Sequence, residues 1–162
     1  HDAQLRLLRD QFVRAQSLPP QQKGYALEKL FVDLMRISGI PVEEPFAIAG
    51  EQLDGAVKHD GSYYLVELKW TAAKLDPKEV GHFYFKVQGK LEARGIVIAI
   101  NGYTGGVLET LPKGRELNVL LLDGEHLRNV LDGRYTFQAL LDHAIRYASL
   151  KGPLYCPHEF DP

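Results

Sequence analysis

Residues 51–70 read EQLDGAVKHDGSYYLVELKW, and this stretch decides the fold of the chain. Its midpoint, Asp60-Gly61, is flanked by two runs that are rich in apolar residues. An Asp-Gly dipeptide in that setting is the strongest short-range signal for a β-hairpin with a two-residue turn. The sequence therefore predicts a hairpin in which His59 faces Ser62, and this turn fixes the pairing of every residue further out.

Four polar residues fall on one face of this predicted hairpin. Counting outward from the turn places Asp54 opposite Glu67 and Gln52 opposite Lys69, and the four side chains share a face because side chains alternate along a strand. Directly opposed residues have Cβ atoms about 5 Å apart, so two carboxylates at these positions repel each other unless a cation lies between them. A bound metal ion is the simplest explanation for the pair.

The other face of the hairpin is apolar and is expected to cover the core. It carries Leu53, Gly55, Val57, Tyr64, Val66 and Leu68. Two alternatives stay open: the charged residues simply face water, or a one-residue bulge shifts the pairing and separates the carboxylates.

The length and composition of the chain indicate one globular domain. The chain has 162 residues, of which 45% are apolar and 25% charged. A chain of this size buries about 70% of the surface of its unfolded form. No stretch approaches the roughly 20 apolar residues that cross a bilayer, and we find no secretory signal. The single cysteine, Cys156, excludes an internal disulfide and a multi-thiolate zinc site, so we expect a cytoplasmic protein without membrane contact.

The charge balance argues against tight DNA binding by charge alone, because the formal net charge is −2. The first residue is His1 rather than methionine, so we expect a domain excised from a longer parent protein or the remnant of a tag. Other domains of the parent, or a second copy of the chain, would then supply the targeting.

Two helices and a short extended stretch are predicted before the hairpin, at about residues 3–15, 22–38 and 42–48. The helices are recognised by apolar residues at helical spacing, and prolines or glycine follow each of them. Glu28 lies at the edge of the apolar stripe of the second helix.

Helices and strands alternate after the hairpin. Asp76-Pro77 is a typical helix start, whereas residues 96–100 and 118–122 are apolar runs typical of strands. Asp123 is expected to cap a helix that reaches about residue 131, and residues 135–150 predict a last helix. The order of these elements indicates an α/β fold with a central mixed sheet flanked by helices.

We divide the chain into an N-terminal helix (1–20), a central domain (21–150) and a C-terminal tail (151–162). The tail contains three prolines and no regular pattern, so we expect it to be loose or to dock on another part of the parent.

Glu28, Asp54, Glu67 and Lys69, placed on this order of elements, resemble the catalytic residues of the restriction-endonuclease-like superfamily, the PD-(D/E)xK nucleases. Leu53 stands where the motif has proline, which is a common relaxation and removes no group that the reaction needs.

The Mrr-type branch is the most similar part of that superfamily. Its Gly-aromatic-x-x-Glu helix signature is matched by Gly24-Tyr25-Ala26-Leu27-Glu28. The resemblance covers about residues 23–100 and implies the restriction-endonuclease-like αβββαβ core.

The resemblance also implies roles for the four residues. Asp54 and Glu67 would be metal ligands, Lys69 would orient or activate the attacking water, and Glu28 would touch the metal shell through water. Oxygen ligands of this kind favour Mg²⁺ or Mn²⁺ as the cofactor.

Further candidates for contact with nucleic acid lie beside the hairpin. His82, Lys86 and Lys90 recur every four residues and would line one side of a helix near the site, and Gln52 shares the face of the carboxylates. The alternative, a helix face that is merely solvated, is equally compatible with the spacing.

Other polar features carry no clear chemistry in the sequence. His126, His143 and His158 have no spacing that indicates zinc, so surface or capping roles are expected for them. The glycine-rich residues 102–106 lack the spacing of a nucleotide-binding motif, and we predict a turn there.

The residues and the resemblance together predict a Mg²⁺-dependent endonuclease domain that hydrolyses DNA. The resemblance also implies that it is the effector part of a restriction or anti-phage defence protein. Cutting both strands together would need two copies, so we expect a homodimer. Two alternatives are kept: a catalytically inactive nuclease fold that serves nucleic-acid binding or assembly, and a nuclease that cleaves RNA or acts in repair.

Overall fold

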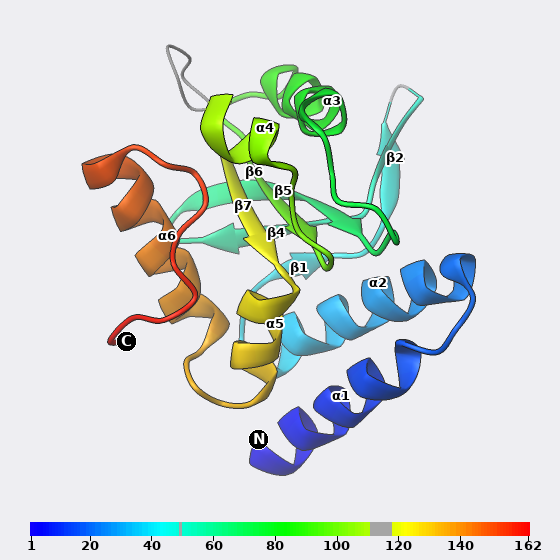
Figure 1. The fold of residues 1–162 in the computed structure, drawn as a ribbon. Coiled ribbons are helices and arrows are strands. Elements are labelled where there is room, and N and C mark those ends of the chain that lie inside the picture. The colour runs from blue at the N-terminus through cyan, green and yellow to red at the C-terminus, as the bar shows by residue number, and fades with distance from the viewer. Residues whose placement is uncertain (49, 111–117) are drawn as a thin grey trace.

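A five-stranded mixed sheet lies at the centre of the molecule (Figure 1). In spatial order its strands are β1 (Val42–Glu43), β4 (Gly55–His59), β5 (Ser62–Lys69), β6 (Arg94–Ala99) and β7 (Val119–Asp123). Strands β1, β4 and β5 pair antiparallel, whereas β5, β6 and β7 are parallel. The structure, a computed structural model, describes residues 1–48, 50–110 and 118–162. The predicted α/β class with a mixed central sheet is confirmed.

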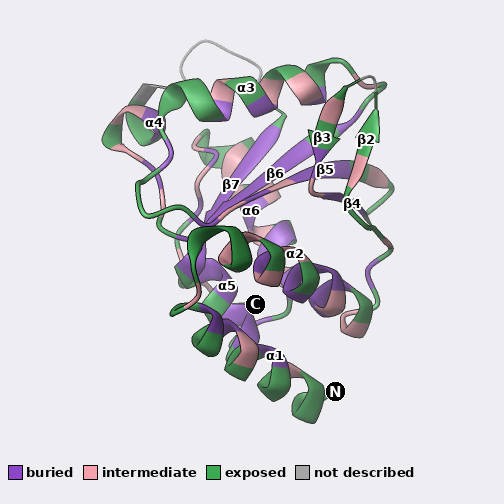
Figure 2. Cartoon of the chain, turned by 90° about the vertical axis from the view of Figure 1, so that its right-hand side faces the viewer, coloured by how far each residue is buried: buried purple, intermediate pink, exposed green. Residues whose placement is uncertain are grey.

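Helices cover both faces of this sheet (Figures 1 and 2). They are α1 (Asp2–Ala15), α2 (Pro20–Ile37), α3 (Pro77–Gln88), α4 (Gly105–Thr110), α5 (Gly124–Leu131) and α6 (Phe137–Lys151). Helices α1, α2, α5 and α6 share one apolar cluster with the sheet, and α3 and α4 share the other. Within the described ranges, no helix is both long and apolar enough to cross a bilayer.

The β4–β5 hairpin has the predicted turn and register. Asp60 and Gly61 both have positive φ, 53° and 81°, which is the backbone of a type I′ turn. The pairing runs from His59↔Ser62 to Gly55↔Val66, as counting from the turn predicts. The turn thus sets the position of Glu67, which follows directly after Val66 on β5.

The register predicted for Gln52 is wrong, because the chain leaves the central sheet at Asp54. Strand β3 (Glu51–Leu53) pairs instead with β2 (Phe46–Ile48) in a separate two-stranded sheet, where Gln52 lies opposite Ala47. The bend coincides with a contact between distant residues: a side-chain oxygen of Asp54 accepts the Leu68 N–H at 2.8 Å, in the place of a main-chain carbonyl.

The bend also changes the packing of the hairpin. Leu53 joins the cluster under α3 rather than the cluster around Val57, so its predicted face is wrong. Ala56 and Leu65 are buried in that same α3 cluster, so both faces of the hairpin are packed. Polar chemistry is therefore confined to the end of the hairpin where the strands separate.

The C-terminal residues pack on β7, which corrects the expectation of a loose tail. Leu121 N–H donates to the Leu154 carbonyl at 3.0 Å, Leu121 also forms a β-bridge with Tyr155, and Cys156 is fully buried. Strand β7 is the last strand of the sheet, and an uncovered edge leaves main-chain groups unpaired. The tail provides hydrogen-bond partners for part of that edge.

A second correction concerns the glycine-rich residues 102–106. Helix α4 begins at Gly105, where a turn was predicted.

The single thiol reports on this docking. Burial raises the pKa of the Cys156 thiol to about 11, so about one molecule in a thousand carries a thiolate at pH 8, against about one in four for a free cysteine. We expect alkylation by iodoacetamide at pH 8 to be about a hundredfold slower in the native protein than in urea. Equal rates in the two conditions would show that the tail is undocked in solution.

Candidate active site

The candidate catalytic residues come from three parts of the chain. Glu67 and Lys69 lie at the C-terminal end of β5, Asp54 lies at the bend between β3 and β4, and Glu28 lies in the middle of α2. All four side chains are half-buried. Groups in this state are partly desolvated yet still accessible to a substrate.

Asp54 is held by the backbone of β5. Its N–H donates to the Val66 carbonyl at 3.3 Å, and its carboxylate accepts from Leu68 N–H. Burial, the negative charge of Asp54 and a hydrogen bond with Asp54 raise the pKa of Glu28. The carboxyl groups of Glu28 and Asp54 are therefore neighbours.

Glu67 lies among groups of both signs. Burial raises its pKa, Lys69 lowers it, Asp54 raises it again, and Lys86 and His82 on α3 lower it; the net effect is a raised pKa. The structure thus brings Glu67 within electrostatic reach of Asp54 and of three basic groups. A carboxylate with a raised pKa is under-compensated, so an additional cation beside it would be stabilised.

This set of donors fits a hard divalent cation. Asp54 and Glu67 offer carboxylate oxygens, with Glu28 adjoining Asp54, and oxygen ligands suit Mg²⁺ and Mn²⁺. The raised pKa values of Glu28 and Glu67 come in part from Asp54, and a bound cation would remove that repulsion. Lys69 stands next to Glu67, where its ammonium group would hold a water molecule or a phosphate oxygen.

Comparison with known proteins places this chain in a family. Residues 21–131 match the model of the family Mrr_cat, which is described as restriction endonuclease. The chain belongs to the Mrr-type restriction endonuclease family. No curated protein matches the chain.

Two solved structures resemble this Mrr-type domain. One is a type III CRISPR defence DNA nuclease activated by cyclic oligoadenylate, with 18% identity and a TM-score of 0.50; the match covers 94% of this chain and 27% of that chain. The other is AF1548, a protein of unknown function, with 14% identity and a TM-score of 0.48; 74% of this chain and 76% of that chain are covered. The first likeness shows a shared fold, and this chain spans about a quarter of the CRISPR nuclease.

The predicted nucleic-acid contacts of the Mrr-type domain separate into two groups. Lys86 and His82 lie near Glu67. Lys90 instead forms an ion pair with Glu51 on β3, and Lys86 also donates to the Gln52 carbonyl at 2.9 Å. The side of α3 that carries His82, Lys86 and Lys90 therefore lies near Glu67 at its N-terminal end. At its C-terminal end it contacts β3 of the two-stranded sheet.

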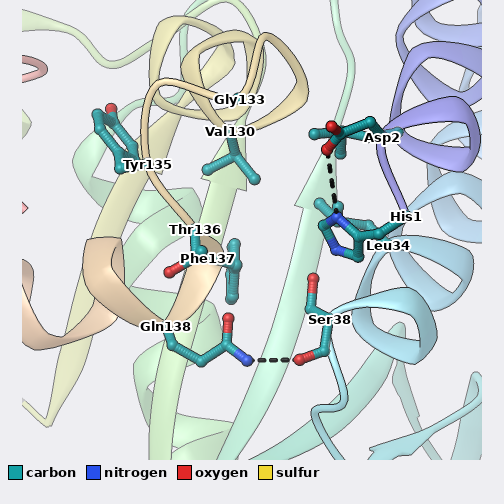
Figure 3. Close-up of a pocket in the computed structure, with 11 residues that line it drawn as sticks. His1, Asp2, Leu34, Ser38, Val130, Gly133, Tyr135, Thr136, Phe137 and Gln138 are labelled. Carbon is teal, nitrogen blue, oxygen red and sulfur yellow. Dashed lines mark hydrogen bonds and ion pairs between the residues drawn. The ribbon is translucent and has the colours of Figure 1, made fainter.

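Two hollows flank different parts of the molecule. A groove of about 350 Å³ runs along α2 from Glu28 past Val32 to Arg36, and Glu28 is the one candidate site residue among those that line it. A larger pocket lies between α1, α2 and the start of α6 (Figure 3), where Gln138 donates to the Ser38 carbonyl. None of the predicted site residues lines this second pocket, so we assign no nuclease role to it.

A second polar cluster escaped prediction from the sequence. Asp123, His126 and His158 place ligand atoms within 4.8 Å of one another, the one group of three so close among the residues that the structure describes. The capping role predicted for Asp123 is observed, since it accepts from the N–H groups of Glu125 and His126. The spacing of Asp123 and His126 on one helical turn was a signal, but nothing local connects them to His158.

Proposed function

We propose that this Mrr-type domain is a divalent-metal-dependent endonuclease that hydrolyses phosphodiester bonds in DNA. The observation that carries the proposal is Glu67, which is close to Asp54, Lys69 and Lys86 in a chain whose residues 21–131 match a restriction endonuclease family. Two carboxylates and a lysine are a minimal set for metal-assisted hydrolysis of a phosphodiester.

Each residue is assigned one task. Asp54 and Glu67 would hold Mg²⁺ or Mn²⁺, and Glu28, in contact with Asp54, would bind a water of the metal shell. A bound divalent cation supplies charge stabilisation at the phosphate and acidifies water. Lys69 orients the attacking water, and because its charge also lowers the pKa of Glu67, it keeps that carboxylate available as a ligand.

DNA is the substrate that we favour over RNA. The solved structure with 18% identity is that of a DNA nuclease in type III CRISPR defence, and the shared fold extends over 94% of this chain. We further propose that the domain is the effector part of a restriction or defence protein, working as a homodimer or beside other domains. The net charge of −2 supports the involvement of other domains, because the domain alone has little general attraction for DNA.

The test is cleavage of supercoiled plasmid DNA by the purified chain, with Mg²⁺, with Mn²⁺ and with EDTA, next to a single-stranded RNA of matched length. Nicked and linear products that need metal and appear with DNA alone would support the proposal. If the chain cleaves the RNA and not the DNA, the proposed substrate is RNA instead of DNA. Absence of cleavage together with DNA binding by the wild-type chain would favour the inactive binding module.

Lys86→Ala is expected to weaken DNA binding rather than to abolish it. Lys86 is half-buried and close to Glu67, so its ammonium group is placed to meet one phosphate. Loss of one phosphate contact lowers the slope of log affinity against log salt by about 1. Fluorescence anisotropy of a labelled duplex with Ca²⁺, over a series of salt concentrations, measures that slope.

Lys151→Ala is the matched control, because Lys151 is an exposed lysine in the last turn of α6. Its slope should equal that of the wild type. If the slope of Lys86→Ala equals that of the wild type, Lys86 does not contact DNA. Its role would then be structural, through the hydrogen bond to the Gln52 carbonyl.

A further inference from the structure

We infer that Asp123, His126 and His158 form a second metal site, selective for Zn²⁺ or a similar transition metal, which fastens the C-terminal tail to the sheet. The site is independent of the proposed nuclease centre and uses none of its residues. Asp123 ends β7 and caps α5, His126 lies in the first turn of α5, and His158 comes from the tail. A metal here would join residues that are 35 positions apart in the chain.

The distances between the three side chains are those of a coordination shell. Nε2 of His158 lies 2.9 Å from both carboxylate oxygens of Asp123, and Nδ1 of His126 lies 3.2 Å from Oδ1 of Asp123. In a tetrahedral site with zinc bonds of about 2.0–2.1 Å, neighbouring ligand atoms are about 3.3 Å apart. The two Asp123–histidine distances are within a few tenths of an ångström of that value, and all three ligand atoms lie within 4.8 Å of one another.

The opposite nitrogen of each imidazole already has the partner that a metal-bound histidine needs. Nε2 of His126 lies 2.9 Å from the Cys156 carbonyl, and Nδ1 of His158 lies 3.2 Å from the Glu125 carboxylate. Such partners fix the ring orientation and direct the remaining lone pair at the metal. Metal binding would replace the hydrogen bond from the Asp123 N–H to Nδ1 of His126 at 3.1 Å. It would also replace the contacts of Nε2 of His158 with the Asp123 carboxylate and with the Tyr155 hydroxyl, each at 2.9 Å.

The donor types select the metal. Two imidazole nitrogens and one carboxylate suit Zn²⁺, whereas Mg²⁺ requires oxygen ligands and keeps its waters. The Tyr155 hydroxyl, which donates to Asp123 and lies 2.9 Å from Nε2 of His158, borders the fourth position. His126 is fully buried, so the ion would be shielded from competing water on that side.

The position of the cluster separates it from the nuclease residues. In the register of the sheet Lys69 lies beside Ala99, and Ala99 lies beside Asp123. Two inter-strand steps of about 4.8 Å put the two backbones about 10 Å apart. Both sites therefore lie at the C-terminal ends of the parallel strands. Because they share no residue, a substitution in one site leaves the ligands of the other in place.

The test uses metal-stripped protein titrated with Zn²⁺ by calorimetry and with Co²⁺, whose visible spectrum reports tetrahedral coordination. We expect one Zn²⁺ per chain, binding about a hundredfold weaker in His158→Gln, and slower alkylation of Cys156 when zinc is bound to the wild type. Glu67→Gln and His59→Gln should bind zinc as the wild type does. Glutamine can keep a hydrogen bond to Asp123, and the Cys156 rate without metal shows whether the tail of the variant is docked.

Three results would overturn the inference. They are absence of zinc binding by the wild type, equal zinc affinity in His158→Gln, and loss of zinc binding in Glu67→Gln, which would move the metal to the nuclease centre. In the first case the cluster is a metal-free hydrogen-bond network that holds the tail by itself.

Discussion

Lys69→Met is expected to lower the rate of metal-dependent DNA cleavage about a thousandfold, because a positioned group that handles the proton of the attacking water contributes roughly 10²–10⁴-fold. Methionine keeps the length and the apolar stem of the side chain and removes the charge alone. Lys69 is half-buried at the end of β5, so the change should affect the free energy of unfolding by little. Single-turnover cleavage of plasmid DNA in Mg²⁺ measures the rate, and urea denaturation measures the stability.

Lys58→Met is the matched control, since Lys58 is an exposed lysine on the same hairpin, near its turn. Its cleavage rate should stay within about twofold of the wild type, as expected for a surface change away from the site. A Lys69→Met protein that cleaves at the wild-type rate would refute the assigned role of Lys69. Equal losses in both variants would indicate a general effect of charge on DNA affinity instead.

Local signals in the sequence were sufficient for the elements that position the site. Asp60-Gly61 determines the turn and hence the register from His59 to Gly55, because both residues must adopt positive φ. Asp76 starts α3, where its side chain accepts from Glu79 N–H at 2.9 Å and a capping box forms. Both signals act within four residues, and neither depends on the rest of the fold.

The features that the sequence did not reveal depend on contacts between distant segments. Asp54 ends the regular pairing by accepting the N–H of Leu68, 14 residues away, and this directs Gln52 into a different sheet. His158 meets Asp123 because the tail returns to cover the edge of β7. Neither event leaves a periodic pattern in the chain, so residue spacing alone could not indicate them.

Phe12→Ala is expected to lower the free energy of unfolding by about 3–5 kcal/mol, the usual cost of removing a buried phenylalanine. Phe12 is 1% exposed, and its ring stacks on the ring of Trp70, with centroids 5.0 Å apart. Trp70 directly follows Lys69, the candidate catalytic lysine. Arg128 of α5 covers the same ring at 5.9 Å. Urea denaturation followed by tryptophan fluorescence measures the effect, and Trp70 is the sole tryptophan of the chain.

Val13→Ala separates packing from helix formation, because Val13 is the next residue of α1 and is 56% exposed. It should change the free energy of unfolding by no more than about 0.5 kcal/mol. The comparison also tests our division of the chain at residue 20, since the family match starts at residue 21 and omits α1. A large loss in Phe12→Ala with none in Val13→Ala would make α1 part of the core that supports Trp70, and so part of the nuclease domain. Equal, small effects would instead favour an N-terminal helix that folds apart from it.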